Sequence, residues 1–181
     1  MDYEKLLEAE LAGFDSRLKH TKGVRDRALE LGTLYKADLE VLEVASLLHD
    51  ITKCYSVDEH IKLIKDHKRL NILSPVMYHA ESAYEYAKSK GISDPRTLEA
   101  IRYHMWGKED MYLETMILCV ADYCEPNRHF KEAEDVYQLA LKDIKEAYLK
   151  ALESTMNHLI KNNKTPHDEQ VRVYLYYKER K

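Results

Sequence analysis

The chain has 181 residues, of which 45% are apolar and 33% charged, and its formal net charge is −4. General nucleic-acid binders carry a basic excess, so no nucleic-acid partner is expected. No apolar run approaches the ~20 residues that a membrane span needs, and no basic and apolar leader pattern predicts a signal peptide. The three cysteines form no CxxC pair, which predicts free thiols and a cytoplasmic location.

Residues that break helices are few, with five glycines and four prolines. Leu, Glu, Lys and Ala, which suit helices, are frequent, and no alternation of period two persists. We therefore expect an all-α fold of about eight or nine helices in a single domain that spans 1–181. Its core is expected at about 15–130, and a C-terminal helical extension at about 131–181.

Helix start and stop signals divide the chain. Asp38 and Asp94 can each accept hydrogen bonds from the first backbone amides of a helix, as can Asp15 or Ser16. Gly91 suits the left-handed residue that ends one. The predicted helices cover about 2–12, 16–35, 39–48, 57–66, 75–90, 95–104, 111–124, 131–161 and 166–181.

Several ionisable residues interrupt apolar helical stripes. They are His20, the pair His49–Asp50 with Lys53 three residues later, His79, His104 and Asp122. A polar group on a core-facing stripe costs several kcal/mol of desolvation unless it is paired or bound to a metal. Side chains from separate helices of a bundle can converge on one cation, so the joint pattern predicts a metal site. For single residues a simpler explanation stays open, since one histidine can be a hydrogen-bonded core residue and Asp50 can cap the following helix.

Three segments resemble one known family. His20 begins an HxxGV run, residues 47–53 read LLHDITK, and residues 120–128 read VADYCEPNR. Together they resemble the bacterial HD-domain proteins of the YqeK type, a family of symmetrical bis(5'-nucleosyl)-tetraphosphatases. The resemblance covers about residues 15–130. It implies an HD-domain helical bundle that hydrolyses diadenosine tetraphosphate to two ADP.

The resemblance also implies a metal centre. The ligands that it implies are His20, His49, Asp50 and Asp122. Iron is the metal expected from the family, with manganese or another divalent transition metal as the alternative, because imidazole and carboxylate together suit such ions. A second metal at His79 and His104 stays open, since the matching positions can hold either a metal or a phosphate.

The expected substrate is an ADP-containing dinucleoside polyphosphate. The residues implied to contact it are Arg17, Asp50, Ile51, Thr52, Lys53, His79, His104, Met105, Asp122 and Arg128. The residues implied in catalysis are Asp50, Lys53, His79 and His104. Asp50 is expected to bind the metal and orient the attacking water, and Lys53 to hold a phosphate as a point charge. His79 or His104 is expected to protonate the departing phosphate or to stabilise its charge.

Other assignments are possible for three further residues. Arg17 could pair with a surface glutamate instead of a phosphate. Arg128 could pair with Asp122, Glu125 or Glu132. Trp106, where the sequence departs from the family pattern, could stack on a base or simply pack in the core.

Two other classes of function stay open. The first is another HD phosphohydrolase, such as a nucleotidase, a dNTPase or a cyclic-dinucleotide phosphodiesterase, since the same ligands serve all of them. The second is a non-catalytic helical module whose tyrosine-rich tail, Tyr174–Lys181, binds a protein or RNA. A homodimer is a further partner that the sequence leaves open.

Overall fold

The computed structural model describes residues 1–180 and contains, within them, eleven α-helices, one 3₁₀ turn and no strand. The all-α prediction is confirmed. The elements are α1 (Tyr3–Glu10), α2 (Asp15–Tyr35), α3 (Leu39–Leu48), α4 (Val57–Leu63), α5 (His67–Ile72), η1 (Pro75–Met77), α6 (Tyr78–Ser89), α7 (Pro95–Tyr103), α8 (Leu113–Tyr123), α9 (Lys131–Ala140), α10 (Ile144–Lys161) and α11 (Asp168–Glu179).

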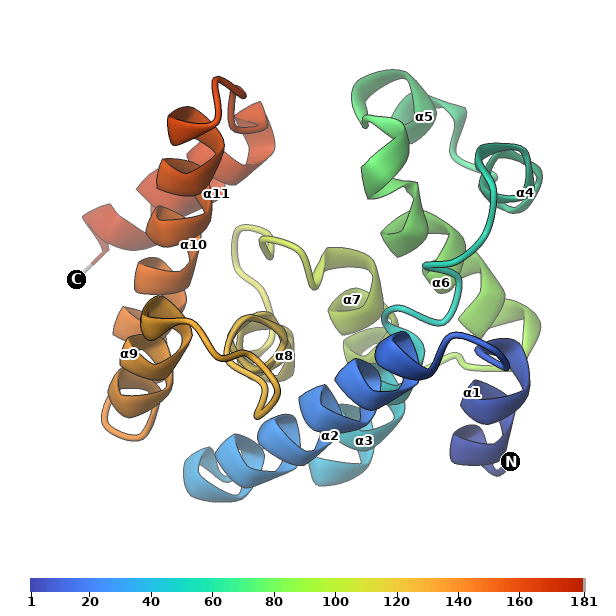
Figure 1. Cartoon of the computed structure of the whole chain (residues 1–181), viewed down its shortest axis with the longest axis horizontal. Coiled ribbons are helices and arrows are strands. Elements are labelled where there is room, and N and C mark those ends of the chain that lie inside the picture. Colours follow the sequence, from blue (N-terminus) through green and yellow to red (C-terminus); the bar gives the residue numbers. More distant parts are fainter. Residues whose placement is uncertain (181) are drawn as a thin grey trace.

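Helix α8 lies at the centre of the bundle (Figure 1), where it contacts α2, α3, α7, α9 and α10. Its residues from Glu114 to Ala121 are all buried, because a helix that is apolar on every side has no face to offer to water. Helices α2 and α3 pack on one side of it, and α9 and α10 on another. Asp122 follows the buried run directly, so the core helix carries a carboxylate at its end.

The expected number of helices was too low. A single helix was predicted over 57–66, but Ile64 has an extended backbone and Asp66 caps a separate α5. The long helix predicted over 131–161 is divided into α9 and α10. The division occurs where Asp143 accepts a hydrogen bond from the amide of Glu146 and starts a new helix. Neither break contains a glycine or a proline. The apolar periodicity continues across both breaks, and for this reason each pair of helices was predicted as a single helix.

Two of the three predicted N-terminal helix caps are confirmed by the structure. Asp38 and Asp94 cap α3 and α7 as predicted, each accepting from backbone amides. The predicted cap at Asp15 or Ser16 is wrong, because α2 already begins at Asp15, and Phe14, which precedes it, makes no side-chain cap. Gly91 has a φ of +88°, the left-handed conformation expected after α6.

Helix α11 packs against the rest of the chain. The Tyr177 hydroxyl accepts a hydrogen bond from the amide of Met111 at 3.0 Å, and the Tyr174 hydroxyl donates to Glu153 at 3.4 Å. The tyrosines of the tail therefore serve intramolecular contacts, while Lys181, its last residue, lies outside the described residues. Among the helices described, none combines the length and the apolar character that crossing a bilayer requires.

Candidate metal centre

The four residues predicted to bind a metal come together from three helices. His20 lies inside α2, His49 and Asp50 follow α3, and Asp122 lies in the last turn of α8. His20 Nε2 is 3.1 Å from Asp122 Oδ1 and 3.9 Å from Asp50 Oδ2, and His49 Nε2 is 3.8 Å from Asp50 Oδ2. His20, His49 and Asp50 form one group whose ligand atoms all lie within 4.8 Å of one another.

A second group shares the same aspartate. His79 Nε2 lies 3.3 Å from Asp50 Oδ1, and His104 Nε2 lies 3.6 Å from it. The two Nε2 atoms are 3.2 Å apart. The two oxygens of Asp50 thus face two groups of imidazoles, and both groups have spacing suited to a cation.

Each of the four imidazoles is oriented by a hydrogen bond at Nδ1. The acceptors are Glu125 Oε1 for His20 (3.2 Å), the Ser46 carbonyl for His49 (2.6 Å), the Val76 carbonyl for His79 (2.9 Å) and the Ile101 carbonyl for His104 (2.8 Å). These oxygens only accept, so in each neutral ring Nδ1 carries the proton and Nε2 carries a lone pair. When the rings are neutral, their Nε2 lone pairs face the cluster of Asp50 and Asp122, an arrangement typical of metal-binding histidines.

Buried polar atoms that lack a hydrogen-bond partner support a cation site between His49 and Asp50. His49 Nε2 and Asp50 Oδ1 are buried and have no hydrogen-bond partner within the described part of the chain. Buried polar atoms without partners are rare and call for a specific cause, such as an ion. Imidazole nitrogens with carboxylate oxygens form a donor set that suits a transition metal, so the residues fit the implied group.

Burial sets the charge of the ligands. It lowers the pKa of His49 to about 4 and that of His79 well below its ordinary value. Both rings are therefore neutral near pH 7 and keep their lone pairs available. Burial alone would raise the pKa of Asp50, but the surrounding imidazoles, first that of His49, are charged in the acid range where this carboxyl titrates, and with the ammonium of Lys53 they hold its pKa well below the usual range.

The metal-free protein is expected to lose stability as the pH falls below about 6.5. Between pH 6.5 and about 4 the unfolded chain protonates the imidazole of His49 but the folded chain does not, so acid favours unfolding. The shift from 6.5 to about 4 corresponds to about 3 kcal/mol once the pH is below 4. Denaturant unfolding of chelator-treated protein at a series of pH values measures this slope. His49→Asn should flatten the slope and His158→Asn, at an exposed histidine, should not; equal slopes in the two variants would contradict the prediction.

Three basic residues border the ligands. Arg17 Nη1 donates to Asp50 Oδ2 at 2.7 Å, so Arg17 pairs with a ligand carboxylate and not with a surface glutamate. Lys53 Nζ lies 2.9 Å from His79 Nε2. Arg128 Nη2 lies 3.5 Å from Asp122 Oδ1 and its Nε 4.0 Å from Glu125, so both of these expected pairings exist. All three cations are therefore close enough to hold phosphate oxygens near the ligands.

Comparison with known proteins identifies the family. The family model described as HD domain matches residues 17–127. The chain is 35% identical over 153 residues to the symmetrical bis(5'-nucleosyl)-tetraphosphatase of Bacillus subtilis, covering 82% of each chain. The chain belongs to the HD-domain family.

Two further relatives agree with this assignment. A symmetrical bis(5'-nucleosyl)-tetraphosphatase of Halalkalibacterium halodurans is 33% identical over 164 residues, 88% of each chain. A crystal structure from Clostridium acetobutylicum, described as a predicted HD superfamily hydrolase involved in NAD metabolism, superposes with a TM-score of 0.90 at 27% identity. That match covers 99% of this chain and 96% of the other.

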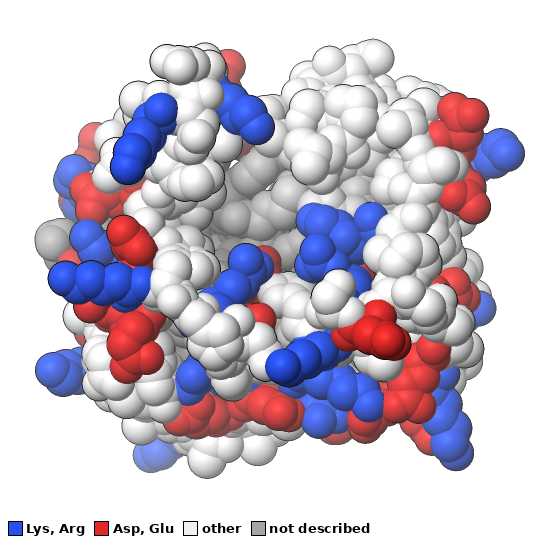
Figure 2. Space-filling view, viewed as in Figure 1, with Lys and Arg blue, Asp and Glu red and all other residues white. Residues whose placement is uncertain are grey.

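The HD-domain centre opens into a cavity of about 380 Å³. Figure 2 shows it as a hollow in the surface with lysine and arginine side chains at its rim, and Lys53 and Arg128 are among its lining residues. His79, His104 and Asp122 lie at its floor beside the ligand groups. The volume falls in the range of small-molecule sites, and the positive charges of Lys53 and Arg128 lie next to the candidate metal ligands.

Part of the cavity wall comes from outside the matched HD segment. Leu152 and Leu159 on α10, with Phe130 before α9, are among its lining residues. These residues could not be predicted from the sequence, since an apolar stripe on a helix is the ordinary pattern of a core-facing helix. Trp106 also lines the cavity, but it is 6% exposed and stacks on His167 with ring centroids 5.0 Å apart, which favours the packing assignment.

The structure brings only part of the expected substrate-binding set to the cavity. Met105 lines it. Ile51 is fully buried in the core, and Thr52 Oγ1 donates to the carbonyl of His79 at 3.0 Å. The side chains of Ile51 and Thr52 therefore support the ligand-bearing segments and do not line the cavity.

Proposed function

We propose that this HD-domain protein hydrolyses diadenosine tetraphosphate symmetrically, giving two ADP. The names of its curated relatives, at 35% and 33% identity over most of both chains, support this activity. The observation that carries the proposal is the convergence of four imidazoles and two carboxylates beside a nucleotide-sized cavity, which His79, His104 and Asp122 line. Such a centre suits hydrolysis of phosphoanhydrides better than simple binding.

The ligands proposed for the catalytic metal are His20, His49, Asp50 and Asp122. Iron is the proposed ion, with manganese or another divalent transition metal as the alternative. When bound, such an ion acts as a Lewis acid toward phosphoryl oxygens and water. Metal analysis of protein purified without added metal would test both the identity of the ion and the number bound per chain.

A second cation at Asp50, His79 and His104 stays a prediction. The three ligand atoms are close enough, but Lys53 Nζ lies 2.9 Å from His79 Nε2 and 3.7 Å from Asp50 Oδ1. A cation there would displace this ammonium. We therefore propose one metal per chain, with Lys53 supplying the second positive charge; two equivalents of tightly bound metal would contradict this.

The polar residues of the site are proposed to orient the attacking water and to bind the phosphates of the substrate. Asp50 is proposed to orient the attacking water as well as to bind the metal. Lys53, Arg17 and Arg128 are proposed to hold the phosphates that do not react, the arginines through paired hydrogen bonds. The Nε2 lone pairs of His79 and His104 support a role in accepting hydrogen bonds or binding a cation, and the proton of Lys53 is the nearest example of such a contact.

Symmetric cleavage follows if the cavity accepts one ADP unit. Water then attacks the second phosphate from the bound nucleoside, the bridging oxygen beyond it leaves with the other half, and both products are ADP. The apolar wall from Leu152, Leu159 and Phe130 is proposed to hold the nucleoside, and the basic residues its phosphates. Met105 is proposed to contact the same unit.

Product analysis tests the activity directly. Purified protein, supplied with iron or manganese and diadenosine tetraphosphate, is expected to release ADP as the sole nucleotide product, resolved by ion-exchange chromatography. ATP with AMP would show asymmetric cleavage and reject the proposal. Release of nucleosides or inorganic phosphate instead would identify a nucleotidase or another HD phosphohydrolase.

The location and the partners of the protein stay predictions. A cytoplasmic location is supported by three cysteines that carry free thiols, Cys54, Cys119 and Cys124. The proposed partner is the nucleotide substrate, with no nucleic acid. A homodimer stays a prediction that size-exclusion chromatography with light scattering would test.

A further inference from the structure

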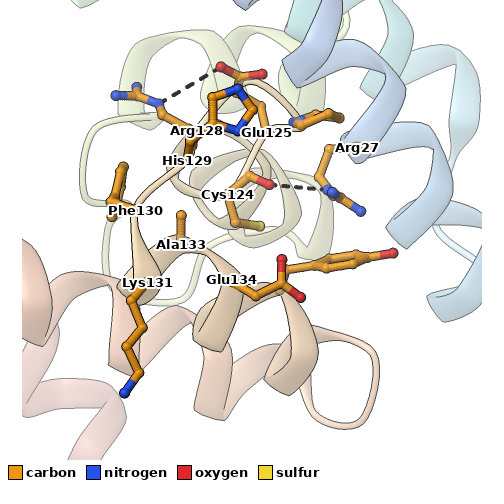
Figure 3. A pocket seen from close by; sticks show the side chains of 11 residues that line it. Arg27, Cys124, Glu125, Arg128, His129, Phe130, Lys131, Ala133 and Glu134 are labelled. Atoms are coloured by element: carbon orange, nitrogen blue, oxygen red, sulfur yellow. Dashed lines mark hydrogen bonds and ion pairs between the residues drawn. The ribbon is translucent and has the colours of Figure 1, made fainter.

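Glu125 is a buried carboxylate beside the metal centre that no catalytic role requires. It lies on the loop between α8 and α9, is 3% exposed, and its Oε1 accepts the hydrogen bond from His20 Nδ1 at 3.2 Å. Figure 3 shows it from the neighbouring cavity, next to Arg128 on the same loop. Burying a carboxylate is costly unless its oxygens are hydrogen-bonded, so its contacts indicate its role.

His20 differs from the other three imidazoles in its position along a helix. His49 and His104 follow the last residues of α3 and α7, and His79 lies in the first turn of α6. Each can reach a carbonyl three residues earlier. His20 lies inside α2, where the nearby carbonyls already accept from the helix's own amides. Among the four rings, within residues 1–180, it alone has a side-chain carboxylate in place of a backbone carbonyl as the acceptor at Nδ1.

The surroundings of Glu125 fix its orientation. Its Oε2 accepts from both the backbone amide and the side-chain amide of Asn127, at 2.6 and 2.8 Å. Gly23, one turn after His20, leaves the necessary space, because a Cβ there would lie 2.4 Å from Glu125 Oε2 and 2.8 Å from Asn127 Nδ2. The glycine of the HxxG run and the EPN run after α8 thus form one unit.

We propose that Glu125 is a positioning residue that keeps the proton of His20 on Nδ1 and presents Nε2 to the metal, and that Gly23 and Asn127 hold it in place for this purpose. The inference rests on the metal centre proposed above. It adds no ligand to the metal; it explains why one ring, remote from any free carbonyl, still has a defined tautomer.

Replacement of Glu125 by glutamine gives a sharp test, because glutamine keeps the shape but has a single acceptor oxygen. Two donors of Asn127 compete for that oxygen, so the amide nitrogen faces His20 Nδ1 and forces it to accept. The proton then moves to Nε2, where Asp122 Oδ1 at 3.1 Å accepts it. This wrong tautomer is fully hydrogen-bonded and excludes the metal.

Replacement by alanine leaves the ring free, since water entering the vacated space can donate or accept. We therefore expect the isosteric variant to be the worse one. Calorimetric titration of metal-free protein with Mn²⁺ should show affinity about 10-fold weaker in Glu125→Ala and about 100-fold weaker in Glu125→Gln. If Glu125 only filled space, Glu125→Ala would bind Mn²⁺ more weakly than Glu125→Gln. That result would overturn the proposal. Glu114→Gln, at a buried glutamate that accepts from the amide of Asp38, is the matched control.

Gly23→Ala provides a second measurement that does not remove Glu125. Alanine favours the helix, so the fold should persist, checked by circular dichroism, while the displaced carboxylate weakens Mn²⁺ binding by about 10-fold. In the Glu125→Ala background the same change should not alter Mn²⁺ affinity, since the carboxylate through which it acts is gone even though the Asn127 side chain must still move aside. Equal effects in the two backgrounds would overturn the proposal. If the unaltered protein did not bind Mn²⁺, the metal centre itself would be rejected. This outcome differs from failure of the Glu125 proposal alone, in which the unaltered protein still binds Mn²⁺.

Discussion

Asp50→Ala is expected to abolish hydrolysis and metal retention together. Both carboxylate oxygens face imidazoles, one toward His20 and His49 and the other toward His79 and His104. Removing them leaves Asp122 as the one ligand carboxylate among four imidazoles, which halves the negative charge available to balance a cation. Because the metal supplies several kcal/mol of transition-state stabilisation, turnover should fall by at least about 10³-fold.

The measurement is metal content by elemental analysis beside ADP release from diadenosine tetraphosphate. Asp94→Ala is the matched control, since Asp94 caps α7 through the amide of Thr97. It should cost about 1 kcal/mol of stability and leave metal content unchanged. Retained activity in Asp50→Ala would refute its assignment as a ligand.

Lys53→Ala is expected to separate substrate handling from metal binding. Its ammonium lies between His79 Nε2 and Asp50 Oδ1, at 2.9 and 3.7 Å, and lines the cavity. Without it a phosphate loses one charge-assisted hydrogen bond, so kcat/KM should fall by about 10²-fold. The ligands themselves stay in place, and one metal per chain should remain bound.

Steady-state kinetics with metal analysis on the same preparation decides this point. Lys65→Ala replaces a lysine that is 79% exposed on its side chain and pairs with Glu85 at 3.6 Å, and it should change neither quantity. Loss of the metal from Lys53→Ala would show that the lysine supports the ligands and that the division of roles is wrong.

Much of the site could be predicted because its ionisable residues occupy helix positions that are normally apolar. His20, the His49–Asp50 pair and Asp122 interrupt apolar stripes, and each such interruption is costly unless something compensates for it. The structure brings these residues within hydrogen-bonding or ligand distance of one another.

Other features left no such mark in the sequence. Glu125 follows a helix, where a charged residue is unremarkable, and its burial depends on the tertiary contact with Gly23. Leu152 and Leu159 line the cavity from a stripe that looks like ordinary core. The helix break at Asp143 could not be predicted because aspartate is also tolerated within helices. Only the hydrogen bond that Asp143 accepts from the amide of Glu146 shows that a new helix starts there.

The cavity wall on α10 has a consequence for how the protein matures during synthesis. All four proposed ligands precede residue 123, whereas the leucines that complete the nucleoside wall lie in a helix that begins at Ile144. Since the chain is synthesised from its N-terminus, the ligand-bearing segments leave the ribosome first. An ion can thus enter while the cleft still lacks one side, before any nucleotide can block its path.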